Sequence, residues 1–356
     1  MKILNSVQQQ KGMTLIELMI GLVIAMILLA GVAEIFLGSK QTYRYQAGMA
    51  RMQENGRYTL STVTEKIRMA GYMGCYSMDT SETVNTVNGG GAVEFDFSKP
   101  IVVWEATTTG YETNKDATLW TAEVPDDVRL LINSTPSGTD FSDILIFTGA
   151  GNDGIRLASK MPDSSAVIKL VNHSPEVIFD DDILLVSDCQ KSAIFQATNV
   201  TYPNSTSPDV NVAHNAGGGG TPGNSTKDLT GDGSSFDSDA SLFSIEKIYY
   251  FVAPSSVNNN SNDTVMALWR KVNANDPEEL VAGVENFQLT LGEDIDDDKS
   301  ADRYGTANIV DFENVVSVRV ELDSNTVERI NIKSNIDDAI PNQSFVQTVL
   351  VRNRSI

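Results

Sequence analysis

The sequence predicts an α+β protein in which one long N-terminal helix carries a mostly antiparallel β head. Three observations support this fold class. Residues 13–38 form an apolar run in which only Glu17 and Glu34 are charged. Helical spacing of apolar residues continues from that run to about Ala70, and the chain after Cys75 consists of short apolar runs separated by polar turns. A hydrophobic content of 41% supports a real core and excludes an intrinsically disordered chain.

The charge balance narrows the class of partner. With 26 Lys and Arg against 47 Asp and Glu, the formal net charge is −21. A surface this acidic repels the phosphates of nucleic acids. We therefore expect no nucleic-acid partner for the head.

The first element is a short basic segment followed by a membrane-length helix. Residues 1–12 carry Lys2 and Lys11, and positive charge before an apolar run favours a cytoplasmic N-terminus with the rest of the chain sent outward. As a helix, residues 13–38 would span about 39 Å, enough to cross a hydrocarbon core of about 30 Å. No small-x-small cleavage site follows the run, which indicates an uncleaved anchor rather than an ordinary secretory signal.

The helix is expected to continue beyond the membrane. Residues 39–74 keep the helical spacing of apolar positions but have a polar face. A continuous helix from Met13 to about Ala70 would be roughly 87 Å long. Because its first half (13–38) is apolar all round and its second half is amphipathic, the second half is expected to pack on the head.

The head is expected to be β-structure in two regions. Runs rich in Val, Ile, Tyr and Phe, bounded by Gly, Asn, Asp and Ser, are typical of strands. They occur at 143–149, 167–171, 182–188, 245–253, 266–272, 285–291, 314–322 and 345–353. The low-complexity segment 214–242 is expected to be a flexible Gly/Ser/Asp loop. It would separate a first β-region (75–213) from a second (243–356), in keeping with a length above that of one typical domain.

Glu17 is the feature that a plain anchor does not explain. A charged side chain within a membrane-length segment costs roughly 2.5–3.5 kcal/mol by insertion scales. The surrounding stretch KGMTLIELMI (11–20) has a basic leader that ends in Gly12, an acid five residues later and an apolar helix. This combination resembles the class III signal of type IV pilins and pseudopilins. The resemblance implies a leader peptide of residues 1–12, cleavage between Gly12 and Met13 by a prepilin peptidase, and N-methylation at Met13.

The resemblance also implies a role for Glu17 in assembly. Cleavage creates an ammonium group at Met13, a second expensive charge near the membrane face. When subunits stack, the carboxylate of one can meet the amine of its neighbour, so that two charges that are costly alone neutralise each other. An incidental acid that snorkels to the interface is the alternative. Most members of the family begin the mature chain with Phe rather than Met, a departure that the peptidase is expected to tolerate.

Later stretches narrow the resemblance to one family of minor pilins. QENGRYTLSTVTEKIRMAGYMGC (53–75) and ILLVSDCQKSAIFQAT (183–198) are similar to the helix end and second cysteine segment of the PilW family. Residues 280–322 and 345–354 complete the pattern. These last segments are also shared loosely with the J-type pseudopilin of type II secretion. The resemblance implies a pilin-like fold, with the apolar half of the helix embedded in the membrane or fibre.

What this family implies about function is assembly. The expected protein is a minor pilin of a type IV pilus that takes part in priming assembly, in a tip complex with other minor pilins and an adhesin. Its implied partners are other minor pilins, the major pilin, the prepilin peptidase, the inner-membrane assembly platform and a tip adhesin. It is expected to cross the inner membrane once, with a periplasmic head, and then to enter the extracellular pilus. A J-type pseudopilin of a type II secretion system and a tip adhesin subunit that binds a surface ligand remain the alternatives.

The two cysteines, Cys75 and Cys189, lie far apart in the sequence. In an exported protein this count indicates one long-range disulfide, whereas in the cytosol it would indicate two unrelated thiols. Because the resemblance implies a periplasmic head, a disulfide between them is expected, and two free buried thiols are the alternative. In the chain-entropy model such a disulfide contributes on the order of 4–5 kcal/mol.

One acidic turn, GEDIDDDKSADRYG (292–305), has part of the spacing of a calcium loop. Closely spaced carboxylates suit this hard cation. The candidate ligands are Asp294, Asp296, Asp298 and Asp302. Lys299 stands where a calcium loop has its turn glycine, and Gly305 where it has its bidentate Glu. A solvated acidic turn is therefore the alternative, and no other cofactor is expected.

Catalysis has little support in the sequence. The chain contains no G-x-S-x-G, G-x-x-x-x-G-K-[ST], H-E-x-x-H or C-x-x-C motif, and its histidines are His173 and His214. These motifs would supply a nucleophile, a phosphate cradle, a zinc site or a redox pair. The protein is expected not to be an enzyme.

Overall fold

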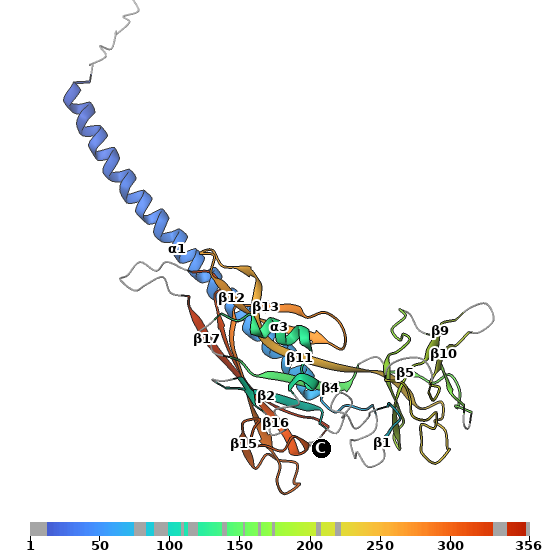
Figure 1. Cartoon of the computed structure of the whole chain (residues 1–356). Coiled ribbons are helices and arrows are strands. Elements are labelled where there is room, and N and C mark those ends of the chain that lie inside the picture. The colour runs from blue at the N-terminus through green and yellow to red at the C-terminus, as the bar shows by residue number, and fades with distance from the viewer. Residues whose placement is uncertain are drawn as a thin grey trace, which may run out of the picture.

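The computed structural model shows a long helix that leads into a β head with a lobe at one side (Figure 1). It describes residues 13–74, 83–88, 99–107, 110–112, 120–136, 141–151, 154–162, 165–172, 175–203, 208–217, 222–329 and 340–353. The predicted fold class, a long N-terminal helix followed by a mostly antiparallel β head, is confirmed.

The helix α1 spans Leu15–Arg68, 54 residues without a break, which is about 81 Å. Its first half extends away from the head, and its second half lies against it (Figure 1). The buried positions of α1 begin only at Met52. The prediction of one helix that continues from an apolar half into a packed half is therefore confirmed.

The second half of α1 packs because its buried side chains form one stripe. They are Met52, Gly56, Thr59, Leu60, Val63, Thr64 and Ile67. Spacings of three and four place these residues on one helical face, and that face lies against the strands β16 and β17. At Gly56 the approach is close enough that a Cβ atom would collide with the ring of Phe345.

The strands that the structure describes in the head form three sheets. The ten-stranded sheet contains β1 (Thr83–Asn85), β2 (Ile101–Thr107), β3 (Gly110–Glu112), β4 (Ile144–Ala150), β5 (Ile155–Arg156), β7 (Ile183–Ser187), β8 (Ser192–Gln196), β11 (Ser241–Asn258), β12 (Thr264–Val272) and β13 (Glu278–Ala282). The three-stranded sheet has the order β6 (Val167–Leu170), β10 (Val210–Ala213), β9 (Asn199–Thr201). The four-stranded sheet has the order β15 (Arg303–Gly305), β14 (Val284–Glu293), β16 (Val315–Asn325), β17 (Asn342–Leu350). Among the described strands, all pairs are antiparallel except β1 with β8.

Short helices complete the described structure. They are α2 (Trp120–Glu123), α3 (Asp126–Asn133) and the 3-10 turn η4 (Phe312–Asn314). The helix α3 covers part of β11, and its Asp127 accepts a hydrogen bond from the buried Lys271 Nζ at 2.7 Å. The head is thus closed on this side by a short amphipathic helix that buries Val128 and Ile132.

The 18-residue strand β11 joins the two predicted β-regions into one sheet. Its start pairs with β7, its middle with β4 and its later part with β12. Since β4 and β7 come from the first region and β12 from the second, the regions do not form separate sheets. The largest core lies between α1, this sheet and the four-stranded sheet.

A second core lies in the side lobe, which we define as β5–β10 with residues 222–240. Its buried residues include Phe195, Val212 and Phe236. The lobe projects sideways from β11, at the right of Figure 1. A small third core around Phe243 lies between the lobe and the main core.

The prediction of a flexible loop at 214–242 is wrong for the described part of that segment. Leu229, Phe236 and Ala240 are buried in the second core. The buried Asn224 accepts a hydrogen bond from Gln196 N at 2.7 Å and donates one to Gln196 O at 2.8 Å. These three apolar side chains and the paired amide hold part of a segment that is otherwise rich in Gly, Ser and Asp. Residues 218–221, which include most of the glycine run, lie outside the described residues.

Candidate assembly site on the N-terminal helix

The N-terminus of α1 is closed by Thr14 and Glu17. Thr14 has extended backbone angles and its Oγ1 accepts a hydrogen bond from Glu17 N at 3.4 Å. In return, Glu17 Oε2 accepts hydrogen bonds from Thr14 N and Thr14 Oγ1, each at 3.0 Å. This reciprocal arrangement is a capping box, which satisfies two backbone donors that a helix start leaves without partners.

The capping role of Glu17 was not part of the sequence interpretation, although its signal is present. A Thr followed three residues later by Glu, immediately before an apolar run, is the capping-box pattern. A carboxylate in the first turn is also favourable beside the positive end of the helix dipole. Because an ionised carboxylate has about four acceptor positions, the cap leaves Glu17 with capacity for a second partner.

The predicted processing site lies directly before this cap. Met13 precedes Thr14 and is 71% exposed, whereas Gly12 lies outside the described residues. Cleavage before Met13 would therefore create an exposed amine one residue from the N-cap. Cleavage, methylation and the pairing of Glu17 with a neighbour's amine stay predictions.

The first half of α1 presents apolar side chains on all sides. From Leu15 to Leu37 its large hydrophobic residues are exposed. In the part of the chain that the structure describes, α1 is the one helix long and apolar enough to cross a membrane. None of its most apolar stretch is buried against the head. An apolar surface of this size needs lipid or other helices to cover it.

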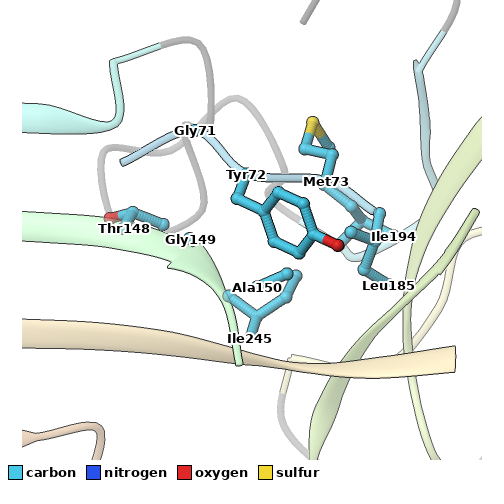
Figure 2. Close-up of a pocket in the computed structure, with 9 residues that line it drawn as sticks. All are labelled: Gly71, Tyr72, Met73, Thr148, Gly149, Ala150, Leu185, Ile194 and Ile245. Carbon is cyan, nitrogen blue, oxygen red and sulfur yellow. The ribbon is translucent and has the colours of Figure 1, made fainter. Parts of the chain in front are cut away.

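The chain leaves α1 through a packed junction (Figure 2). Gly71 N donates to Thr148 O at 3.3 Å, and Ala150 N donates to Tyr72 O at 3.0 Å. The ring of Tyr72 meets the ring of Phe243 edge to face at 6.0 Å. Gly71, Tyr72, Thr148 and Ala150 are among the residues that line a cavity of about 10 Å³, which has room for about one water. The contacts at the junction fix the direction in which the chain leaves the helix. The cavity there is too small for a cofactor.

The predicted disulfide is only partly visible. Cys189 is disulfide-bonded, and Cys75 lies outside the described residues. Gly74, the residue before Cys75, has φ +78° and lies so close to β7 that a Cβ atom there would be 3.4 Å from Ser187 Cβ. The helix exit therefore runs beside the strand that leads to Cys189. The pairing of Cys75 with Cys189 stays a prediction, and this placement agrees with it.

The acidic turn after β14 brings three of its four predicted ligands together. Carboxylate oxygens of Asp294, Asp296 and Asp302 lie within 4.8 Å of one another. Asp298 instead accepts a hydrogen bond from Ser300 N at 2.8 Å. The pKa of Asp296 is raised, chiefly by the charge of Asp298 and then by that of Asp302. Mutual repulsion of this kind is what a bound cation would relieve.

The same turn also forms internal hydrogen bonds to its carboxylates, which do not need an ion. Asp294 accepts hydrogen bonds from Asp297 N at 2.7 Å and from Lys299 N at 2.9 Å. Lys299 adopts φ +70°, so this position has the left-handed geometry that a calcium loop gives to glycine. Both alternatives from the sequence remain open, and the calcium ligand set stays a prediction.

Two protein-family models match the chain. Residues 8–33 match the prokaryotic N-terminal methylation motif, which covers the cap and much of the apolar half of α1. Residues 249–353 match PilW, the type IV pilus-assembly protein W, over a segment that includes all strands from β12 to β17. No curated protein and no solved structure matches the chain. The methylation motif lies at an exposed apolar helix, and the PilW match covers strands that pack on that helix. Both matches are consistent with a PilW-type pilin that has a class III signal and is related to the type IV pilus.

Proposed function

We propose that this protein takes part in priming the assembly of a type IV pilus and remains at or near the tip, with other minor pilins and an adhesin. The observation that carries the proposal is the division of α1. The head folds around the second half of the helix and leaves the apolar first half bare. That half is suited first to a membrane and then to a bundle of similar helices.

The side lobe favours a position near the tip. It has its own core and projects away from the axis of α1 (Figure 1). A subunit repeated in every layer of a thin fibre must fit its head between neighbours on all sides. A head with such a lobe fits more easily where fewer subunits surround it.

We infer the following path from the helix and the signal. The leader stays in the cytoplasm, the helix crosses the inner membrane once and the head lies in the periplasm. Prepilin peptidase cuts between Gly12 and Met13, and the new terminus is methylated. The inner-membrane assembly platform then moves the subunit into the fibre. In this proposal the protein acts by assembly rather than by catalysis.

In this proposal, Glu17 sets the axial register between neighbouring helices in the fibre. Its carboxylate caps its own helix and keeps acceptor positions for the Met13 amine of a neighbour. Both charges are costly in an apolar surrounding, and pairing them removes much of the cost. A helix shifted along the bundle would lose the pair.

Glu17→Ala with Glu34→Ala as its matched control tests this function, because both acids lie on the apolar half of α1. In cells that lack the native gene, wild type and Glu34→Ala are expected to restore surface pili and to appear in the sheared fibre fraction. Glu17→Ala is expected to stay in the membrane fraction. Equal amounts of Glu17→Ala and wild type in the fibres would contradict the role of Glu17.

Deletion of the whole chain separates the alternatives. Loss of surface pili supports a role in assembly. Normal pili with loss of attachment would indicate a tip adhesin, and normal pili with blocked protein secretion would indicate a pseudopilin.

A further inference from the structure

The strand β17 forms an edge of the four-stranded sheet that no described strand covers. It is nine residues long, and its sequence NQSFVQTVL contains no charge and no proline. One of its long sides pairs with β16 from Ser317↔Leu350 to Asn325↔Asn342. The other side is the outer margin of the head at the left of Figure 1.

The other edge strands of the described sheets are protected in ways that β17 is not. The strand β5 has two residues, and β1, β3, β9 and β15 have three residues each. The strand β6 has four residues and carries an exposed Lys169, and β13 has five and begins with Glu278 and Glu279. Short length and charge are the usual means by which proteins prevent strands from pairing at an edge. Because β17 has neither protection, its edge is suited to pairing with another strand.

The register identifies the groups that face outward. Val351 N donates to Val316 O at 2.8 Å, just beyond the pair Ser317↔Leu350. Because hydrogen-bonded and non-hydrogen-bonded pairs alternate in an antiparallel ladder, the N–H and C=O groups of Val346, Thr348 and Leu350 point away from β16. The side chains of Val346 and Leu350 are 46% and 57% exposed. The edge therefore offers a row of backbone donors and acceptors flanked by apolar side chains.

The position of β17 favours a neighbouring pilin as the occupant, an argument that rests on the proposed function. The strand packs on α1 through Phe345, whose ring lies on Gly56. In a fibre whose helices lie side by side, the flank of this helix is where the next subunit passes. The interface between helices and the free edge of β17 are thus continuous.

Charge favours a different pilin over a second copy of this chain. With a net charge of −21, two of these heads repel each other. The strand β16, next to the edge, carries charged side chains on the face of the sheet that Val346 shares. They are Arg319, Glu321 and Asp323, which pair with Thr348, Val346 and Ser344 of β17. An uncharged strand on a less acidic head meets this edge without that repulsion.

We propose that the free edge of β17 accepts an extended, uncharged strand from the head of a different pilin subunit, which adds to the four-stranded sheet. Backbone hydrogen bonds to the outward groups of β17 supply the affinity, and contacts with Val346 and Leu350 supply selectivity. The contact would fix the orientation of the two heads after the helices have met.

Photo-crosslinking in cells that assemble the pilus tests the occupant. A photo-reactive amino acid is placed at Thr348 of the full-length chain and, as a matched control, at Thr290. Both threonines pair with Arg319 and so lie in one row across the sheet, but Thr290 is on the inner strand β14. The expected result is a crosslink from Thr348, and none from Thr290, to a peptide in the head of another pilin. A crosslink to a second copy of this chain, an equal crosslink from Thr290, or none from Thr348 overturns the proposal.

Val346→Pro tests the edge itself. Proline removes an N–H that points outward and leaves the ladder with β16 intact. The yield of the Thr348 crosslink is expected to fall by about tenfold, which corresponds to 1.4 kcal/mol. Val346→Thr, which keeps the N–H but replaces one methyl group with a hydroxyl, is expected to lower the yield of the crosslink by less than Val346→Pro does. If Val346→Pro lowers the melting temperature of the head, Val346→Lys replaces it, because a charge at the edge blocks pairing without removing a backbone group.

The outcomes separate this proposal from the proposed function. If deletion of the chain leaves piliation unchanged and wild type is absent from sheared fibres, the proposed function fails. If wild type is required for pili and the folded Val346→Pro and Val346→Lys variants crosslink as wild type does, only the role of β17 fails.

Discussion

At the scale of single residues, Asp143 is a buried carboxyl group that links two sheets. It is fully buried just before β4. Its Oδ1 accepts a hydrogen bond from Ala106 N at 2.8 Å in β2, and its Oδ2 accepts one from Leu289 N at 2.7 Å in β14. Burial raises the pKa of Asp143 to about 7, while the two backbone donors act in the opposite direction. Asp143 therefore links the ten-stranded sheet to the four-stranded sheet, but burial makes the ionisation of its carboxyl group unfavourable.

We predict that Asp143→Asn removes a decline of stability between about pH 4 and pH 7. A pKa raised in the folded state means that the folded chain holds more protons than the unfolded chain in this range, so the free energy of unfolding falls as pH rises. The decline is on the order of a few kcal/mol. Urea unfolding of the full chain in detergent at several pH values measures it. An unchanged pH profile in Asp143→Asn would show that other groups cause the decline, such as Glu105, whose pKa burial also raises.

His214, in the second core, has an effect on the pH dependence of stability that is opposite to that of Asp143. Its side chain is fully buried, and neither ring nitrogen has a hydrogen-bond partner among the described residues. The ring of Phe195 lies 5.2 Å away. Burial lowers the pKa of His214 to about 4. Protonation in the folded state would place an uncompensated charge in an apolar core.

We predict that His214→Phe makes the protein more stable at pH 5. The folded-state pKa is below the unfolded value of 6.5, so stability is lost as pH falls from about 6.5 to about 4. A phenyl ring keeps the packing and cannot take up a proton, and the gain at pH 5 is expected to be about 1–2 kcal/mol. Denaturant melts of both proteins at pH 5 and pH 8 measure the difference. A gain of the same size at pH 8 would attribute the effect to packing alone.

At the scale of elements, the contact between α1 and β17 depends on a glycine. Alanine at an exposed helical glycine normally stabilises a helix by about 1 kcal/mol. At Gly56 the new methyl group would collide with the ring of Phe345. Crowding in a packed contact costs about 1–3 kcal/mol, which outweighs the gain in helix propensity.

We therefore predict that Gly56→Ala destabilises the wild-type head and stabilises a Phe345→Ala variant. The change of sign follows because the smaller side chain removes the collision and leaves only the helix propensity. Gly38→Ala is the control, since a Cβ atom there has no neighbour within 4 Å. Thermal unfolding of the four combinations at positions 56 and 345 gives the coupling energy. A Gly56→Ala change that acts equally in both backgrounds would contradict the proposed contact.

The elements that sequence reasoning found are those with enough length to show a period. The helix α1 and every predicted strand run have counterparts in the structure, and strand ends differ by a few residues. The three-residue strands β1, β3 and β9 are too short for an alternation to be visible. The strand β2 (IVVWEAT) begins with four buried residues in a row, so its burial has no period of two to read. The capping role of Glu17 was not predicted, because Glu17 was interpreted from the cost of its charge in an apolar segment and not from its spacing of three residues from Thr14.

At the scale of the whole molecule, the arrangement of sheets could not be read from the sequence. The order β1-β8-β7-β11-β4-β2-β3 joins strands that are far apart in the chain, and single-sequence periodicity contains no information on such pairs. The segment 214–242 separates two β-regions in sequence, yet β11 unites them in space. The candidate assembly site was predictable because its residues are consecutive in the chain. The free edge of β17 was not, because it is defined by the absence of a described neighbour.

The link between the helix exit and the side lobe leads to the last prediction, that Cys75 and Cys189 form a disulfide and that Cys189→Ser lowers stability. Cys189 follows β7 in the lobe, and Gly74 packs beside the end of that strand. A bond across so long a loop restricts the unfolded chain, and the chain-entropy model gives its loss a cost on the order of 4–5 kcal/mol. Reducing and non-reducing gels are expected to show different mobilities for wild type and equal mobilities for Cys189→Ser. Because one bond is broken in either case, Cys75→Ser with Cys189→Ser is expected to cost no more than Cys189→Ser alone. Thiols in the oxidised protein that react with a maleimide would refute the bond, and the orientation of the lobe would then depend on the packed junction at Tyr72 and Phe243.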